Sequence, residues 1–190
     1  MGSRSRVSIP VSAATPVEDV IAARGSQRRM NPDRGLPLDV VRACMTVALR
    51  GVPVPHWIAA HNVEGLAPGL YRWSDLRSPL RSGTMREELR RICLGQAQGG
   101  DAAFVAIAAI NVACLSDQQY REAQLAAGLA EGRLHLAAYA LGASATGMTF
   151  RDGEIPGGSV RPRGHTHKRS PKQFCRHDTG SSVGNPRVRR

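Results

Sequence analysis

Apolar residues along this chain recur with the periods of both helices and strands. Helical spacing, often closed by glycine, predicts helices over residues 15–24, 36–51, 84–95 and 116–142. Shorter apolar runs predict strands over 57–63 and 69–73 and a last strand over 143–150. The stretch 102–112 has too little polarity for a surface element, so we predict a central strand there. This mixture predicts an α+β protein.

Ser/Thr-x-x-Glu/Gln tetrads stand at three of the predicted helix starts. Such capping boxes satisfy the free N–H groups of a first helical turn. The tetrads begin at Thr15, Thr84 and Ser116. In the first helix, Val17, Val20 and Ile21 form an apolar stripe.

The long predicted helix also contains Gly128 and Gly132, four residues apart. Each interior glycine costs roughly 1 kcal/mol relative to alanine. We interpret these glycines as the place where another group approaches the helix closely. A contact with another helix is the first explanation. Another backbone or a flat ligand is the alternative.

The residue composition changes abruptly near residue 157. Residues 157–190 contain 9 Lys or Arg and one acid, whereas residues 1–156 contain 17 Arg and 14 acids. Most of the formal net charge of +11 therefore lies in the tail. Because the tail has few hydrophobic residues and no regular period, we predict that it is disordered. The predicted organisation is a flexible arm (1–14), one domain (15–156) and a basic tail (157–190).

A basic tail can neutralise phosphates, which predicts weak, salt-sensitive nucleic-acid binding without sequence preference. The residues concerned are Arg161, Arg163, Lys168, Arg169, Lys172 and Arg176. Zinc-ligand residue types also occur there, at His165, His167, Cys175 and His177. Their spacing is not that of a known zinc finger, so we predict no metal site. The alternative interpretation is a shifted reading frame, which would make the charge of the tail accidental.

Four cysteines are widely scattered with no C-x-x-C pair, which favours reduced thiols in an intracellular protein. The N-terminus has no continuous apolar segment of the kind a signal peptide needs. The longest apolar run is too short to span a bilayer. We therefore expect a cytoplasmic protein without a membrane partner.

An arginine-rich stretch, RGSQRR, follows the first predicted helix at residues 24–29. Guanidinium and hydroxyl groups make charge-assisted hydrogen bonds to phosphate. Arg24, Ser26 and Arg28 are therefore candidate phosphate ligands, and Gly25 would let the backbone approach closely. The alternative is a solvated basic turn. We interpret Arg29 as solvated.

Several segments resemble the nitroreductase family of flavoproteins and its SagB-type branch. They are TPVEDVIAARGSQRRMNPDRGLPLDVV (15–41), VEGLAPGLYRW (63–73), LRSGTMREELRRICLGQ (80–96) and AAGLAEGRLHLAAYALGASATGMTF (126–150). The resemblance covers residues 15–156. It implies an antiparallel sheet flanked by helices and a homodimer with FMN at the subunit interface. It also implies that Arg24, Ser26 and Arg28 hold the FMN phosphate and ribityl chain. NAD(P)H would reduce the flavin by hydride transfer, and a small-molecule acceptor would then take the electrons.

The chain departs from the family pattern in several places. The segment RGVPVPHW lacks the family's asparagine, and no lysine stands beside Tyr120, so azoline oxidation is not carried over. His56 is interpreted as a turn residue and His135 as a helix-boundary residue with locally satisfied nitrogens. We assign no catalytic side chain. Because the tail resembles no family element, we expect the final strand of the fold to be missing. A non-catalytic flavin-binding protein or truncated relic is the alternative function.

Overall fold

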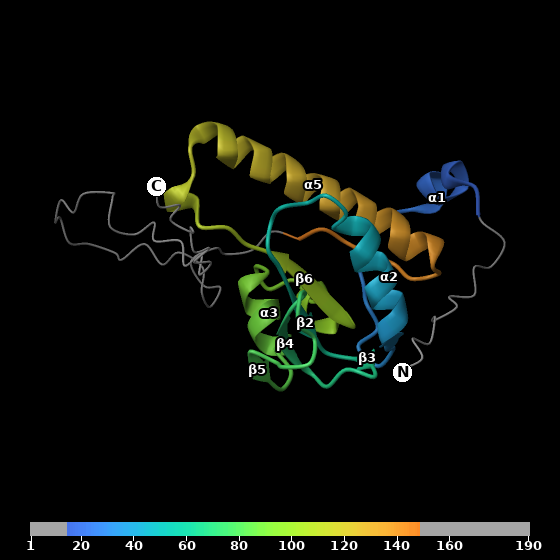
Figure 1. Cartoon of the computed structure of the whole chain (residues 1–190). Helices are drawn as coiled ribbons and strands as arrows, with labels where there is room; N and C mark the ends of the chain where they lie inside the picture. Colours follow the sequence, from blue (N-terminus) through green and yellow to red (C-terminus); the bar gives the residue numbers. More distant parts are fainter. Residues whose placement is uncertain (1–14, 149–190) are drawn as a thin grey trace, which may run out of the picture.

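The computed structural model describes residues 15–148 and forms an antiparallel sheet with helices on both faces (Figure 1). The helices are α1 (Val17–Ala23), α2 (Leu38–Ala48), α3 (Arg86–Ile92), α4 (Gln98–Asp101), the 3-10 helix η1 (Val112–Cys114) and α5 (Asp117–Ala140). The strands are β1 (Leu36–Pro37), β2 (His56–Ala60), β3 (Val63–Glu64), β4 (Gly69–Arg72), β5 (Arg81–Ser82) and β6 (Phe104–Ala108). The predicted α+β class is confirmed.

The main sheet has the strand order β5-β4-β2-β6, and each pair of adjacent strands in it is antiparallel. β1 and β3 form a separate parallel pair. The stretch 102–112, predicted to be a central strand, is a strand only at Phe104–Ala108. Within the described residues this strand pairs with β2 alone and lies at the end of the sheet.

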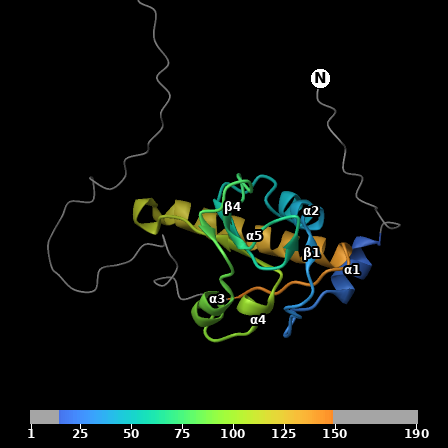
Figure 2. The ribbon, with the colours of Figure 1, turned by 90° about the horizontal axis from the view of Figure 1, so that it is seen from below.

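The alternation of side chains in β2 divides the core into two layers. Ile58 and Ala60 pack with Val41 and Met45 of α2, and Leu134 of α5 packs against the same cluster. On the opposite face, β2 residue Ala59 packs with the α3 residues Leu89 and Ile92. Figure 2 shows α2 on one side of the molecule and α3 and α4 on the other.

Helix capping follows the sequence prediction at one position and departs from it at two. The Ser116 hydroxyl accepts a hydrogen bond from the Gln119 N–H at 3.2 Å, and the Gln119 side chain returns to the Ser116 N–H at 2.9 Å, so this capping box is confirmed. α1 instead starts after Pro16 and α3 after Met85, both without a side-chain cap. The predictions for Thr15 and Thr84 are therefore wrong.

The apolar stripe predicted for α1 is also wrong. Val20 is buried, but Val17 and Ile21 are 55% and 53% exposed. α1 is only 7 residues long and lies beside the C-terminal end of α5 (Figure 1), and Val20 is its single buried residue. No strand forms over 143–148, where one was predicted, and residues 149 and 150 lie outside the described part.

Within residues 15–148, no helix is both long and apolar enough to cross a membrane. No group of three or more potential metal-ligating side chains occurs in that same range. The arm (1–14) and the basic tail (157–190) lie outside the described residues, and so do the disorder and the nucleic-acid binding predicted for the tail.

Candidate functional site

The four arginines between α1 and β1 lie on one loop, residues 24–34, which we call the arginine loop. They are Arg24, Arg28, Arg29 and Arg34. All four side chains are exposed, and none forms an ion pair with another residue in the range 15–148. Asp33 is the single acid of the loop. The loop therefore presents a net charge of +3, four arginines less one aspartate, to its surroundings.

Side chains from separate elements hold this loop to the body by donating hydrogen bonds to its main-chain carbonyls. The Tyr139 hydroxyl on α5 donates to the Gly25 carbonyl at 3.0 Å. The Gln98 amide on α4 donates to the Arg28 carbonyl at 2.8 Å. Because the donors contact the loop backbone, they fix its course and leave its arginine side chains free.

Two further contacts extend this fixation along the loop. The Asn62 amide, beyond β2, donates to the Asp33 carbonyl at 3.2 Å. The Gln27 N–H donates to the Ala145 carbonyl at 3.1 Å, which ties the loop to the segment after α5. A surface loop held by contacts from so many elements has little conformational freedom left to lose when a ligand binds.

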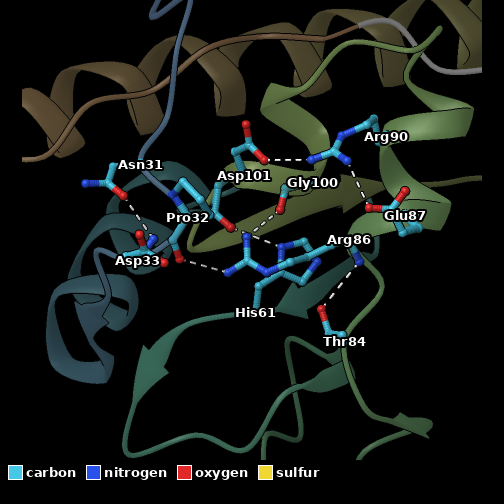
Figure 3. Close-up of polar contacts among 11 residues, drawn as sticks. Asn31, Pro32, Asp33, His61, Thr84, Arg86, Glu87, Arg90, Gly100 and Asp101 are labelled. Carbon is cyan, nitrogen blue, oxygen red and sulfur yellow. Dashed lines mark hydrogen bonds and ion pairs between the residues drawn. The ribbon is translucent and has the colours of Figure 1, made fainter.

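Arg86 of α3 joins the arginine loop to α4 (Figure 3). Its guanidinium donates to the Pro32 carbonyl at 3.1 Å and also to the Gly100 carbonyl. One helical turn later, Arg90 forms ion pairs with Glu87 at 2.9 Å and with Asp101 at 2.8 Å. These two arginines have a structural role, because their guanidinium groups bind carbonyls and carboxylates of the protein itself.

His61 lies against this junction and is 6% exposed (Figure 3). Its Nδ1 is 3.0 Å from the Ala102 carbonyl, which can only accept, so Nδ1 carries the proton. Its buried Nε2 has no hydrogen-bond partner among the described residues. Burial lowers the pKa of His61, the hydrogen bond to Ala102 opposes the shift, and the nearby Arg86 charge lowers it further. His61 is therefore neutral at pH 7.

A cavity of about 740 Å³ opens beside the arginine loop. Its walls come from that loop, α2, β6, α5 and residues 142–148. Apolar side chains such as Val41, Phe104 and Leu134 line it, together with Arg29 and Arg34. This volume falls within the range of about 300–1,000 Å³ typical of ligand and cofactor sites.

The predicted phosphate ligands lie next to the cavity rather than in its wall. Arg24, Gly25, Ser26 and Arg28 do not line it, whereas their neighbour Arg29 does. The Ser26 hydroxyl shares a hydrogen bond of 2.8 Å with the Thr146 hydroxyl. A Cβ at Gly25 would come no closer than 3.9 Å to the Tyr139 hydroxyl oxygen, so the described residues leave room for a side chain there.

Arg29 is exposed, in line with the sequence interpretation, and it also lines the cavity. The two singled-out histidines differ from their interpretation. His56 begins β2, lines the cavity, and has its Nδ1 at 2.7 Å from the Val54 carbonyl. His135 lies inside α5 rather than at its boundary, and its buried Nε2 has no partner within residues 15–148.

Burial governs the titratable groups of the cavity wall. It lowers the pKa of His56, and the hydrogen bond to Val54 opposes that shift. Burial also raises the pKa of the Cys44 thiol to about 11. Because a thiol rather than a thiolate is present at neutral pH, Cys44 is not an activated nucleophile.

Comparison with known proteins supports a nitroreductase-like fold. No protein-family model matches the chain, and no curated protein matches it. A solved structure from Anabaena variabilis, described as a "putative nitroreductase", superposes with a TM-score of 0.59 and 27% sequence identity. The match covers 66% of this chain and 30% of that one, so this chain spans less than a third of that protein.

Proposed function

We propose that this protein is an FMN-dependent oxidoreductase of the nitroreductase type. The observation that carries the proposal is the arginine loop, whose backbone is fixed while its guanidinium groups remain unpaired beside a cavity of about 740 Å³. Free guanidinium groups on a fixed backbone suit a phosphate, and a partly apolar cavity suits a planar ring system.

Arg24 and Arg28 would hold the phosphate by charge-assisted hydrogen bonds, and the Ser26 hydroxyl would add a neutral one. The Ser26 hydroxyl can donate to a phosphate oxygen while it accepts a hydrogen bond from Thr146. Gly25 would keep the backbone accessible. When bound, FMN would supply the redox chemistry between NAD(P)H and a small acceptor. The chain itself would position the cofactor, and no side chain is assigned as a catalytic acid or base.

A homodimer forms part of the proposal, and exposed apolar residues on α5 support it. Leu125 and Leu129 are 75% and 48% exposed. A Cβ at Gly128 or Gly132 would meet nothing within 4 Å. The helix–helix contact expected at these glycines is therefore absent within the described part of one protomer. Close approach by another subunit or a flat ligand remains as the explanation.

Flavin titration tests the cofactor assignment. Flavin fluorescence would be followed while protein is added to FMN and, in parallel, to riboflavin, which lacks the phosphate. We expect FMN to bind more tightly by about tenfold or more, the effect of one or two charge-assisted hydrogen bonds. The variant Arg24→Gln/Arg28→Gln should abolish this preference, and Arg72→Gln, an exposed arginine away from the cavity, should keep it. Absence of quenching at high micromolar FMN would contradict the proposal.

Two departures from the family pattern favour a second candidate, a flavin-binding protein without turnover. The segment RGVPVPHW lacks the family's asparagine, and no lysine stands beside Tyr120. Steady-state oxidation of NADPH with a nitroaromatic or quinone acceptor separates the two candidates. Turnover supports the oxidoreductase, whereas flavin binding without turnover supports the second candidate.

A further inference from the structure

Two arginines of the loop are not used by the proposed phosphate contacts. Arg29 and Arg34 line the cavity, and within residues 15–148 neither forms an ion pair. Their backbone is fixed locally. The Gln27 amide donates to the Arg29 carbonyl at 3.0 Å, and the Arg34 N–H donates to the Asn31 carbonyl at 3.2 Å.

The acidic residues of the cavity wall do not cancel these two charges. Asp101 lines the cavity, but its carboxylate is paired with Arg90 at 2.8 Å. Glu131 also lines the cavity, from α5 rather than from the loop. Two arginines and one glutamate without ion pairs in the range 15–148 thus line the cavity, which leaves its wall with a positive surplus on the loop.

The remaining wall is suited to an aromatic ring. Val41 of α2, Phe104 of β6 and Leu134 of α5 contribute apolar surface. A ligand that places a ring in this cavity beside the flavin of the proposed function, and an anionic group at the loop, would satisfy both parts of the wall. Guanidinium groups bind carboxylates and sulfonates in a planar, two-pronged geometry that an amide or ester cannot match.

We propose that Arg29 and Arg34 form an anion-binding end of the cavity that selects aromatic electron acceptors carrying a carboxylate or sulfonate. This inference rests on the proposed oxidoreductase for turnover, although binding alone can be measured without it. It assigns to these two residues the choice of acceptor, whereas Arg24, Ser26 and Arg28 are assigned to the cofactor.

The test compares 4-nitrobenzoate with 4-nitrobenzamide, which differ in charge and little in shape. Dissociation constants would be measured by isothermal titration calorimetry on the FMN-saturated full chain, or on the protein as purified if FMN does not bind. We expect about tenfold tighter binding of the carboxylate, in line with charge-assisted hydrogen bonds at an exposed site. Arg29→Gln/Arg34→Gln should remove that preference, and Arg72→Gln should retain it.

Kinetics and salt dependence complete the test. In the double variant kcat/KM should fall about tenfold for 4-nitrobenzoate, stay constant for 4-nitrobenzamide, and stay constant for NADPH. The preference should also weaken as salt is raised. Equal affinity of the native protein for both compounds would overturn the inference, and so would an equal effect of Arg72→Gln. A loss of FMN affinity or of kcat/KM for NADPH in the double variant would assign these arginines to the cofactor or the dinucleotide and would also overturn it. Failure of FMN binding would count against the proposed function alone, because the calorimetric comparison still gives an answer.

Discussion

Replacing Arg86 with methionine should destabilise the protein and loosen the arginine loop. The guanidinium of Arg86 donates to the carbonyls of Gly100 and Pro32, and methionine keeps much of the aliphatic stem but no donor. Gly100 is buried, so its carbonyl would lose a charged donor that water cannot easily replace. Pro32 is exposed and also accepts a weak hydrogen bond from Asn62 at 3.4 Å, so its loss is small.

A hydrogen bond to a charged group contributes about 1.5–3 kcal/mol when it is buried, and much less when it is exposed. The buried bond to Gly100 therefore dominates, and the expected loss for Arg86→Met is about 2 kcal/mol in the free energy of unfolding. With a urea dependence of about 2 kcal/mol per M, the unfolding midpoint should fall by about 1 M. Affinity for FMN should fall as well, because the loop would lose one of its fixed points.

Urea unfolding followed by far-ultraviolet circular dichroism measures this loss. Arg86→Lys keeps the charge but has a single ammonium that cannot bond both carbonyls as a fork, so an intermediate loss of about 1 kcal/mol is expected. Arg72→Met is the control, because the exposed Arg72 side chain should contribute within about 0.5 kcal/mol. If Arg86→Met changes the free energy of unfolding by less than about 0.5 kcal/mol and the variant binds FMN normally, the contacts of Arg86 stabilise neither the protein nor the arginine loop.

Three other changes test different parts of the structure. Ile58→Ala removes a fully buried side chain of β2 and should lower the free energy of unfolding by about 3 kcal/mol in the same urea experiment, and a loss below about 1 kcal/mol would contradict its core position. Because burial and the Arg86 charge hold the pKa of His61 below 6.5, the protein should be fully stable above pH 6.5 and lose stability as pH falls through the lowered pKa. His61→Gln should flatten that decline, measured as thermal midpoints between about pH 5 and 7, and an unchanged slope would show that His61 does not contribute to it. Gly132→Ala should stabilise the protomer by roughly 0.5–1 kcal/mol, because the new Cβ meets nothing within 4 Å. If the variant is instead destabilised at concentrations where a dimer forms, Gly132 lies in the dimer interface.

Sequence periodicity was sufficient for the long elements and insufficient for the short ones. α2 and α5 form where their helical patterns predicted, because 11 and 24 residues give enough turns for the period to be clear. α1 has only 7 residues, too few for an apolar stripe to specify which residues meet the body. In the strand predicted over 102–112, alanines suit several conformations, and pairing with β2 decides that only Phe104–Ala108 is extended.

The arginine loop could be predicted from residue types, but the residues that hold it could not. Gln98, Arg86 and Tyr139 are separated from the loop by 54 to 114 residues in sequence. Each of them contacts a main-chain carbonyl, and every residue type offers such a carbonyl. No pairing of side-chain types therefore marks these contacts in the sequence. The cavity role of Arg34 depends in the same way on tertiary packing that brings α2 and α5 beside the loop.

α5 physically connects the proposed dimer interface with the proposed cofactor site. The helix has 24 residues, yet only Ala130, His135 and Ala138 are buried. Two interior glycines, each costing roughly 1 kcal/mol, lower its intrinsic stability further. Packing against α2 stabilises one face of this helix, and Tyr139 near its end fixes the arginine loop through Gly25. Any contact that covers the exposed face of α5 would therefore also stabilise the arginine loop, because Tyr139 near the C-terminal end of α5 holds that loop. Dimer formation and cofactor affinity should accordingly be coupled, because both depend on how firmly this one helix is held.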